Sequence, residues 1–239
     1  MTTETTEKPK EEKWIRNIVI DTLNGVQNDE FTELSKKPNF DIWYDFGKDV
    51  LQLYLHLKTL PNVVLVQILG REGSGKTVGG MFLNPDETVW LNTDKKPLSF
   101  IGAKKMYPVD GSKKNYFTPN TYKQIETLIT GASKKSKDPL IIYILGHIEE
   151  FKSGVESRER LKVLGKMATK LNVEGGLIHT YYTDIDVSKQ GNDPSRYRLS
   201  TMNSGFNTAR SPMGMWEESY IANNYQLITD KIVKEWSDQ

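Results

Sequence analysis

The chain has 239 residues, enough for one large domain or two small ones, and its formal net charge of +1 excludes a strong overall attraction to nucleic acid or membranes. Hydrophobic residues make up 37% and charged residues 26%, so the chain can bury a core and keep a solvated surface. There is no cysteine, which excludes disulfides and thiol chemistry. No apolar run is long enough to span a bilayer, so we expect no membrane segment.

The beginning of the chain differs in composition from the rest. Residues 1–13 are mainly Thr, Glu, Lys and Pro, without the apolar stretch of a signal peptide. This composition predicts a disordered tail. Residues 14–239 show no internal repeat and no low-complexity linker, so we expect them to form one domain.

Two strand candidates precede the most specific motif of the chain. The first, residues 18–20, is an apolar run that ends at Asp21. A carboxylate at the end of a buried strand is typical of a Walker B site, where it holds Mg²⁺; the alternative is an aspartate that caps the following turn. The second, residues 62–69, is rich in β-branched residues and predicts a strand buried on both faces.

Residues 70–77 read Gly-Arg-Glu-Gly-Ser-Gly-Lys-Thr, which matches the phosphate-binding loop pattern G-x-x-x-x-G-K-[ST]. The glycines let backbone N–H groups turn toward a phosphate, and a helix opening after Thr77 would add its positive end. Lys76 can reach the β- and γ-phosphates, and the Thr77 hydroxyl can bind Mg²⁺. The alternative is a chance glycine turn before a helix. The predicted nucleotide-binding residues are Gly70, Arg71, Glu72, Gly73, Ser74, Gly75, Lys76, Thr77 and Val78.

Two later strands also end at polar residues. The strand expected within residues 87–92 precedes Asp94, which could polarise a water attacking the γ-phosphate or could be a loop aspartate beside lysines. The strand expected at residues 140–145 precedes His147, which could sense the γ-phosphate or be a structural histidine.

The rest of the chain predicts further helices and strands. Residues 152–171 are basic and amphipathic, which fits either a solvated helix face or a nucleic-acid-binding loop. We expect helices at residues 40–60, 119–132 (with Thr118 as the N-cap) and 224–236, and strands at residues 176–185 and 197–202. Residues 207–215 read as an irregular basic loop.

Strands alternating with helices predict an α/β fold, with a mostly parallel central sheet covered by helices on both faces. Ligands of such sheets bind at the carboxyl ends of the strands, where Asp21, the phosphate loop, Asp94 and His147 all fall. The Walker B candidate precedes the phosphate loop, the reverse of the usual order. We therefore expect a permuted strand order in which the strand ending at Asp21 lies beside the strand at residues 62–69.

The sequence resembles the RecA-like P-loop ATPases of bacteriophages, including the group linked to single-strand DNA annealing and recombination. The resemblance is carried by residues 18–22, 70–77, 92–97, 146–149 and 208–215. It implies a RecA-like fold, ATP and Mg²⁺ as ligands, and an ATPase that acts in phage recombination or annealing. It further implies single-stranded DNA and further copies of the chain as partners, and a location in the cytoplasm, that of the host if a phage encodes the chain.

The resemblance also implies roles for individual residues. Asp21 would bind Mg²⁺, Asp94 would stand where a catalytic glutamate is expected, and His147 would act as a sensor. Arg210 would act across a subunit interface on the nucleotide of a neighbour; the alternative is a loop charge that pairs with Glu217 or Glu218. Because aspartate is one methylene shorter than glutamate, hydrolysis could be slow. The alternative functions are a nucleotide-binding structural or regulatory phage protein with little turnover, and a small-molecule kinase.

Overall fold

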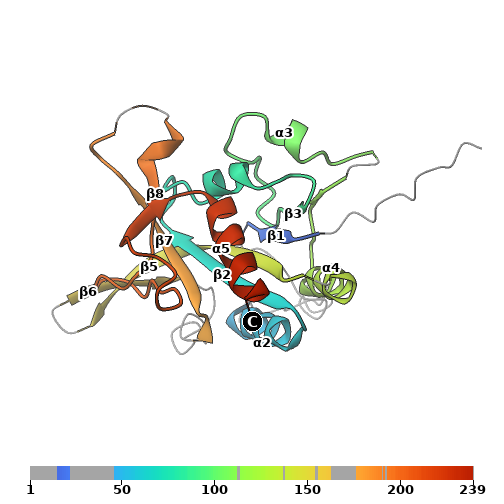
Figure 1. The fold of residues 1–239 in the computed structure, drawn as a ribbon, viewed down its shortest axis with the longest axis horizontal. Coiled ribbons are helices and arrows are strands. Elements are labelled where there is room, and N and C mark those ends of the chain that lie inside the picture. Colours follow the sequence, from blue (N-terminus) through green and yellow to red (C-terminus); the bar gives the residue numbers. More distant parts are fainter. Residues whose placement is uncertain are drawn as a thin grey trace, which may run out of the picture.

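The computed structural model describes residues 15–21, 46–111, 114–136, 138–153, 156–162, 176–189, 191 and 193–238. The predicted tail and most of the basic segment after residue 162 lie outside these ranges. The strands are β1 (Asn17–Ile20), β2 (Val63–Gly70), β3 (Thr88–Leu91), β4 (Tyr116–Phe117), β5 (Leu140–Ser153), β6 (Glu156–Leu161), β7 (His179–Ile185), β8 (Tyr197–Ser200) and β9 (Tyr220–Ala222). The helices are α2 (Phe46–Thr59), α3 (Ala103–Met106), α4 (Tyr122–Lys135) and α5 (Tyr225–Ser237), with short 3-10 helices η1 (Thr77–Phe82) and η4 (Pro194–Arg196) (Figure 1).

The nine strands form one mixed sheet in the order β4-β3-β1-β5-β2-β7-β8-β9, with β6 paired to β5. Neighbours from β4 to β7 are parallel, whereas the β7–β8, β8–β9 and β5–β6 pairs are antiparallel. The prediction of a RecA-like, mostly parallel α/β sheet is therefore wrong: the sheet is mixed, because its β7–β8–β9 end and the β5–β6 pair are antiparallel. The physical reason lies in the connections: a parallel crossover needs a dozen or more residues and usually a helix, and the described residues of the link from β7 to β8 carry only the short η4.

The predicted neighbourhood of the Walker B candidate is also wrong. β5, rather than β1, lies directly beside the phosphate-loop strand β2, and β1 is the next strand beyond it. Because all three strands are parallel, their carboxyl ends still meet at the same edge of the sheet.

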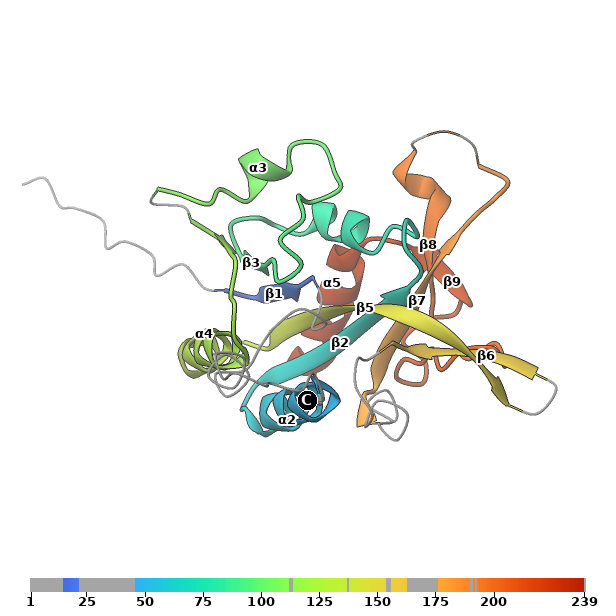
Figure 2. The ribbon, with the colours of Figure 1, turned by 180° about the vertical axis from the view of Figure 1, so that it is seen from behind.

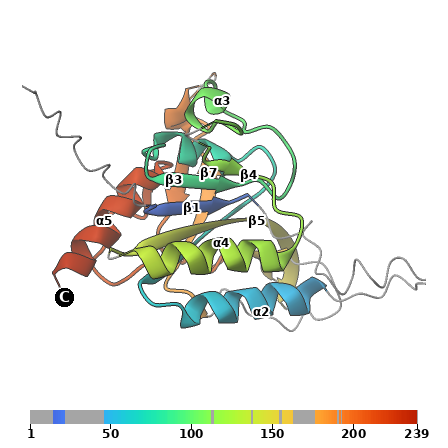
Figure 3. The ribbon, with the colours of Figure 1, turned by 90° about the vertical axis from the view of Figure 1, so that its right-hand side faces the viewer.

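Each face of the sheet packs against its own helices. Ile18 and Ile20 point to the cluster that contains α2 and α4, which lie side by side (Figure 3). Val19, between them in sequence, belongs to the cluster on the opposite face with Trp90 and α5. This alternation is the period of two that a β-strand imposes, and it places an apolar layer on both sides of β1.

Two helix predictions need correction. The segment after the phosphate loop is the 3-10 helix η1 rather than an α-helix, and its two consecutive glycines, Gly79 and Gly80, are poor helix formers. The helix predicted from residue 119 starts later, because Thr121 rather than Thr118 is the N-cap of α4. Thr121 and Gln124 form a reciprocal capping box that fixes this start.

Strand β5 continues well past its predicted end at residue 145. Its 14 residues run to Ser153, and the second half pairs with β6 as a hairpin that extends beyond the sheet (Figure 2). The described part of the predicted basic segment is therefore a strand and not a helix face. None of the described helices is long and apolar enough to cross a membrane.

Candidate functional site

A cavity of about 400 Å³ lies where β1, β2 and β3 end, between the phosphate loop, the residues that follow β1 and β3, and His147 in the middle of β5. We call it the loop cavity. Nine predicted site residues line it together: Asp21, Glu72, Gly73, Gly75, Lys76, Thr77, Val78, Asp94 and His147. The other lining residues are Lys96, Pro97, Ser99 and Tyr197. The structure thus brings together residues that are up to 176 positions apart in the chain, from Asp21 to Tyr197.

The phosphate loop turns at two glycines with positive φ, Gly73 (71°) and Gly75 (86°). A Cβ on Gly75 would also lie 2.4 Å from the ring of Tyr197. This position therefore requires glycine for two reasons, its positive φ and the close approach of Tyr197. The Lys76 side chain folds back along the loop, where its ammonium donates to the carbonyl oxygens of Gly70 (2.9 Å) and Arg71 (2.7 Å). The ammonium is therefore held at the mouth of the loop, where a bound phosphate would lie.

The loop cavity holds charges that are partly withdrawn from water. Burial, and next the nearby Asp94 carboxylate, raise the pKa of Asp21 to about 6. Burial lowers the pKa of Lys76 to about 8, against the opposing effect of Asp21. Strongly perturbed groups that share one cavity are typical of functional sites.

The donor set fits Mg²⁺ shared with a phosphate rather than a cation held by protein alone. No group of three or more His, Cys, Asp or Glu residues that could hold a metal exists among the described residues. Mg²⁺ commonly takes one or two carboxylates and completes its shell with phosphate and water. Asp21 and the Thr77 hydroxyl, which is hydrogen-bonded to Ser99, supply oxygen donors of this kind within the loop cavity.

Asp94 and His147 line the same cavity as Asp21 and Thr77. The Asp94 carboxylate forms an ion pair with Lys96 (2.9 Å), so both alternatives for Asp94, a cavity carboxylate and a partner of a loop lysine, describe part of its environment. His147 is the register partner of Gly70, and its Nδ1 lies 3.5 Å from the Lys76 ammonium. Burial and Lys76 lower the pKa of His147, which favours the neutral imidazole.

Three predicted nucleotide-binding residues turn away from the loop cavity. Gly70, Arg71 and Ser74 do not line it. Arg71 instead pairs with Glu150 and with Glu159 (3.0 Å), which tethers the phosphate loop to the β5–β6 hairpin.

The charge of this hairpin is balanced. Arg160 pairs with Glu149 at 2.8 Å, and the two glutamates that bind Arg71 face each other across the β5–β6 pair. The described part of the predicted nucleic-acid-binding segment therefore alternates basic and acidic side chains instead of presenting a uniformly basic surface.

Arg210 does not line the loop cavity. Its backbone forms an isolated bridge with Thr180, through hydrogen bonds of 2.8 and 2.9 Å, and its Nε contacts the Thr208 carbonyl oxygen at 3.5 Å. The structure does not bring Arg210 to the cavity of its own chain, and its role toward a neighbouring subunit stays a prediction.

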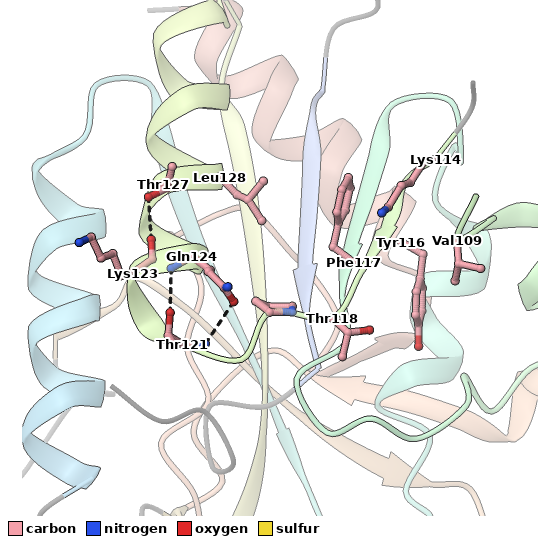
Figure 4. Close-up of a pocket in the computed structure, with 11 residues that line it drawn as sticks. Val109, Lys114, Tyr116, Phe117, Thr118, Thr121, Lys123, Gln124, Thr127 and Leu128 are labelled. Atoms are coloured by element: carbon pink, nitrogen blue, oxygen red, sulfur yellow. Dashed lines mark hydrogen bonds between the residues drawn. The ribbon is translucent and has the colours of Figure 1, made fainter. Parts of the chain in front are cut away.

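A larger hollow, of about 820 Å³, lies between the edge strand β4 and helix α4 (Figure 4). This β4–α4 groove is lined by apolar side chains such as Val109, Phe117 and Leu128 and by Lys114 and Lys123, and its lining contains no carboxylate. We assign the functional site to the smaller loop cavity because that cavity combines a phosphate loop with buried charges of both signs.

Sequence reasoning missed the residues that support the phosphate loop from the second half of the chain. Thr183 on β7 donates to the Leu69 carbonyl oxygen (3.1 Å) and is bonded to the Ser74 hydroxyl (2.6 Å). Asn223 and Tyr225 contact the loop as well. No local pattern marks these positions, because each acts through a contact with residues more than 100 positions away.

The chain was compared with protein-family models, curated proteins and solved structures, and none of the three comparisons found a match.

Proposed function

We propose that the protein binds a nucleoside triphosphate, ATP, together with Mg²⁺ in the loop cavity, and that it is an ATPase. One observation carries the proposal: a complete phosphate-loop motif shares a cavity with Asp21 and Asp94, which follow β1 and β3, and with His147 in β5. In this proposal Lys76 binds the β- and γ-phosphates, while Thr77 and Asp21 would hold Mg²⁺. Mg²⁺ held there would offset the negative charge of the phosphates.

In hydrolysis, water attacks the γ-phosphorus and the bond to the β,γ-bridging oxygen breaks, which yields ADP and phosphate. In this proposal Asp94 accepts a proton from that water, which requires its carboxylate to leave Lys96. His147, which lines the same cavity, would contact the γ-phosphate from the side of β5.

The second candidate function is a nucleotide-binding structural or regulatory protein with little turnover. The ion pair between Asp94 and Lys96 favours it, because a carboxylate engaged by an ammonium is less available to a water molecule. The two candidates share the same binding site and differ only in the rate of hydrolysis.

The proposed role in phage recombination or single-strand annealing, with its cytoplasmic location, rests on the sequence resemblance. The test is ATP hydrolysis measured with and without single-stranded DNA. Stimulation by DNA supports that role, binding without turnover supports the regulatory function, and failure to bind any nucleoside triphosphate with Mg²⁺ overturns the assignment of the site.

Arg210 extends the proposal to an assembly of subunits. A guanidinium supplied by a neighbour is worth about 10³–10⁵ in rate where it operates. Mixing Arg210→Ala subunits with Lys76→Ala subunits tests this role, because some mixed interfaces pair an intact phosphate loop with an intact arginine. Recovery of hydrolysis supports action across the interface. Full activity of Arg210→Ala alone excludes it.

A further inference from the structure

The C-terminal segment reaches the phosphate loop at two successive carbonyl groups. The Asn223 side-chain amide donates to the Gly75 carbonyl oxygen at 2.6 Å, and the Tyr225 hydroxyl donates to the carbonyl oxygen of Lys76. Asn223 follows β9 directly, and Tyr225 is the first residue of α5. Together they hold the loop at the residues where it turns from the glycines into η1.

The direction of these bonds matters for phosphate binding. A phosphate loop works by presenting N–H groups to the anion, and a carbonyl oxygen that rotated toward the phosphate would repel it. Donors that hold the carbonyl groups of Gly75 and Lys76 from the protein side keep those dipoles turned away from the loop cavity. Because both acceptors are fixed carbonyl oxygens, the Asn223 amide must present its NH₂ group to Gly75.

The buried position of Asn223 leaves one polar atom of its side chain without a hydrogen bond among the described residues. Its side chain is 2% exposed, and its Oδ1 atom is buried without a hydrogen-bond partner in the described structure. A buried unsatisfied acceptor is destabilising. An apolar residue would avoid that cost, so the value of asparagine here lies in the bond that it donates to the phosphate loop.

The tyrosine is fixed equally firmly. Its ring stacks on Tyr143 with centroids 4.9 Å apart, and a Cβ on Gly79 would lie 2.3 Å from the Tyr225 ring. The Tyr143 hydroxyl is bonded to the Tyr225 carbonyl oxygen and to Thr229, each at 2.8 Å. The loop is thus tied through Tyr225 to strand β5 and helix α5 by buried groups.

We propose that Asn223 and Tyr225 are positioning residues for the nucleotide site, so that nucleotide affinity depends on how α5 is seated against the phosphate loop. This inference rests on the proposed nucleotide-binding function and adds to it a control point outside the strand–loop–helix unit that contains the motif. Neither residue lines the loop cavity, so neither is expected to touch the nucleotide.

The chain offers two matched pairs of variants for a test. Asn223→Ala removes the donor to Gly75, whereas Asn224→Ala removes the N-cap of α5 one residue later, a bond to Gln226 N at 2.9 Å that does not involve the loop. Tyr225→Phe removes the hydroxyl that contacts Lys76, whereas Tyr181→Phe removes another buried tyrosine hydroxyl, one that contacts Met215 and Trp216.

The probe is ATP carrying a fluorescent methylanthraniloyl group, titrated with Mg²⁺ present, and each variant is also melted without nucleotide. We expect Asn223→Ala and Tyr225→Phe to bind about five- to tenfold more weakly than the wild type, the loss of one buried hydrogen bond each. Asn224→Ala and Tyr181→Phe should lower the melting temperature but change affinity less than twofold.

The outcomes separate this inference from the proposed function. If the wild type binds the probe and both members of each pair change affinity equally, α5 has only a structural role and the inference is overturned. Should Tyr225→Phe fail to fold, the asparagine pair alone decides. If the wild type binds no probe, the proposed function itself fails.

Discussion

The loop cavity and the β4–α4 groove show what makes a hollow on this protein a candidate site. The groove has twice the volume, about 820 against 400 Å³, but its lysines lie at the surface, and Lys114 rests over the Phe117 ring at 5.0 Å. The loop cavity is smaller and contains ionisable groups whose pKa values burial has moved, Asp21 upward and Lys76 downward. The comparison teaches that buried ionisable groups, rather than the volume of a hollow, identify the candidate site.

Removing one lysine from each hollow is the strongest test of which hollow binds the nucleotide. Lys76→Ala should weaken nucleotide binding on the order of 100-fold, because charge-assisted hydrogen bonds to phosphate are lost. Lys123→Ala in the β4–α4 groove is the matched control and should leave affinity within twofold. Calorimetric titration with ATP and Mg²⁺ measures both. Equal effects of the two variants would remove the reason for preferring the loop cavity.

Asp21→Asn should have opposite effects on two quantities: it should weaken nucleotide binding with Mg²⁺ and stabilise the ligand-free protein. Nucleotide binding in the presence of Mg²⁺ should weaken about tenfold, while binding without the metal changes little, because the amide removes a charge from a hard-cation site. A loss of affinity that is the same with and without Mg²⁺ would argue against a metal-binding role.

The same variant should stabilise the ligand-free protein. The pKa of Asp21 is raised from 3.8 to about 6, so the ionised form is disfavoured in the folded state. The cost is absent below pH 3.8 and fully present above about pH 6, where it reaches up to about 3 kcal/mol. At pH 7.5 we therefore expect Asp21→Asn to melt at a higher temperature than the wild type, as scanning calorimetry would show.

The pH dependence of binding should follow the same two groups. Asp21 must be ionised to attract Mg²⁺, so affinity should rise as the pH increases through about 6. Lys76 must be protonated to attract phosphate, so affinity should fall as the pH increases through about 8. Titrations from pH 5 to 9 should give a maximum between these values, with a several-fold decline on each side. In Asp21→Asn the acidic limb should disappear.

The smallest expected effect concerns the wall of the groove. Gly131 is an exposed residue within α4, and a Cβ there would meet no atom within 4 Å. Gly131→Ala should raise the melting temperature by about 2–3 °C, because alanine favours the helix by about 0.5–1 kcal/mol. Nucleotide affinity should be unchanged. A change in affinity would show that the groove and the loop cavity communicate.

Much of the local structure follows from local patterns. The apolar run of residues 18–20, the β-branched run before Gly70 and the apolar spacing near residues 50–57 are sufficient to predict β1, β2 and α2. The predicted site residues Asp21 and Asp94 share one cavity because parallel strands present their carboxyl ends at one edge, and His147 in β5 is in register with the end of β2. These predictions required only the order of the strands and helices along the chain.

The sequence by itself therefore determined the phosphate loop, the strands that bear polar residues at their ends, and most helix positions. Only the tertiary structure decided the mixed sheet, the insertion of β5 between β1 and β2, and the hold of Asn223 and Tyr225 on the loop. The physical reason is the distance along the chain over which each kind of interaction acts. Periodicity and turn chemistry act over a few residues, whereas strand order and the contacts between residues 75 and 223 depend on which distant surfaces bury each other best.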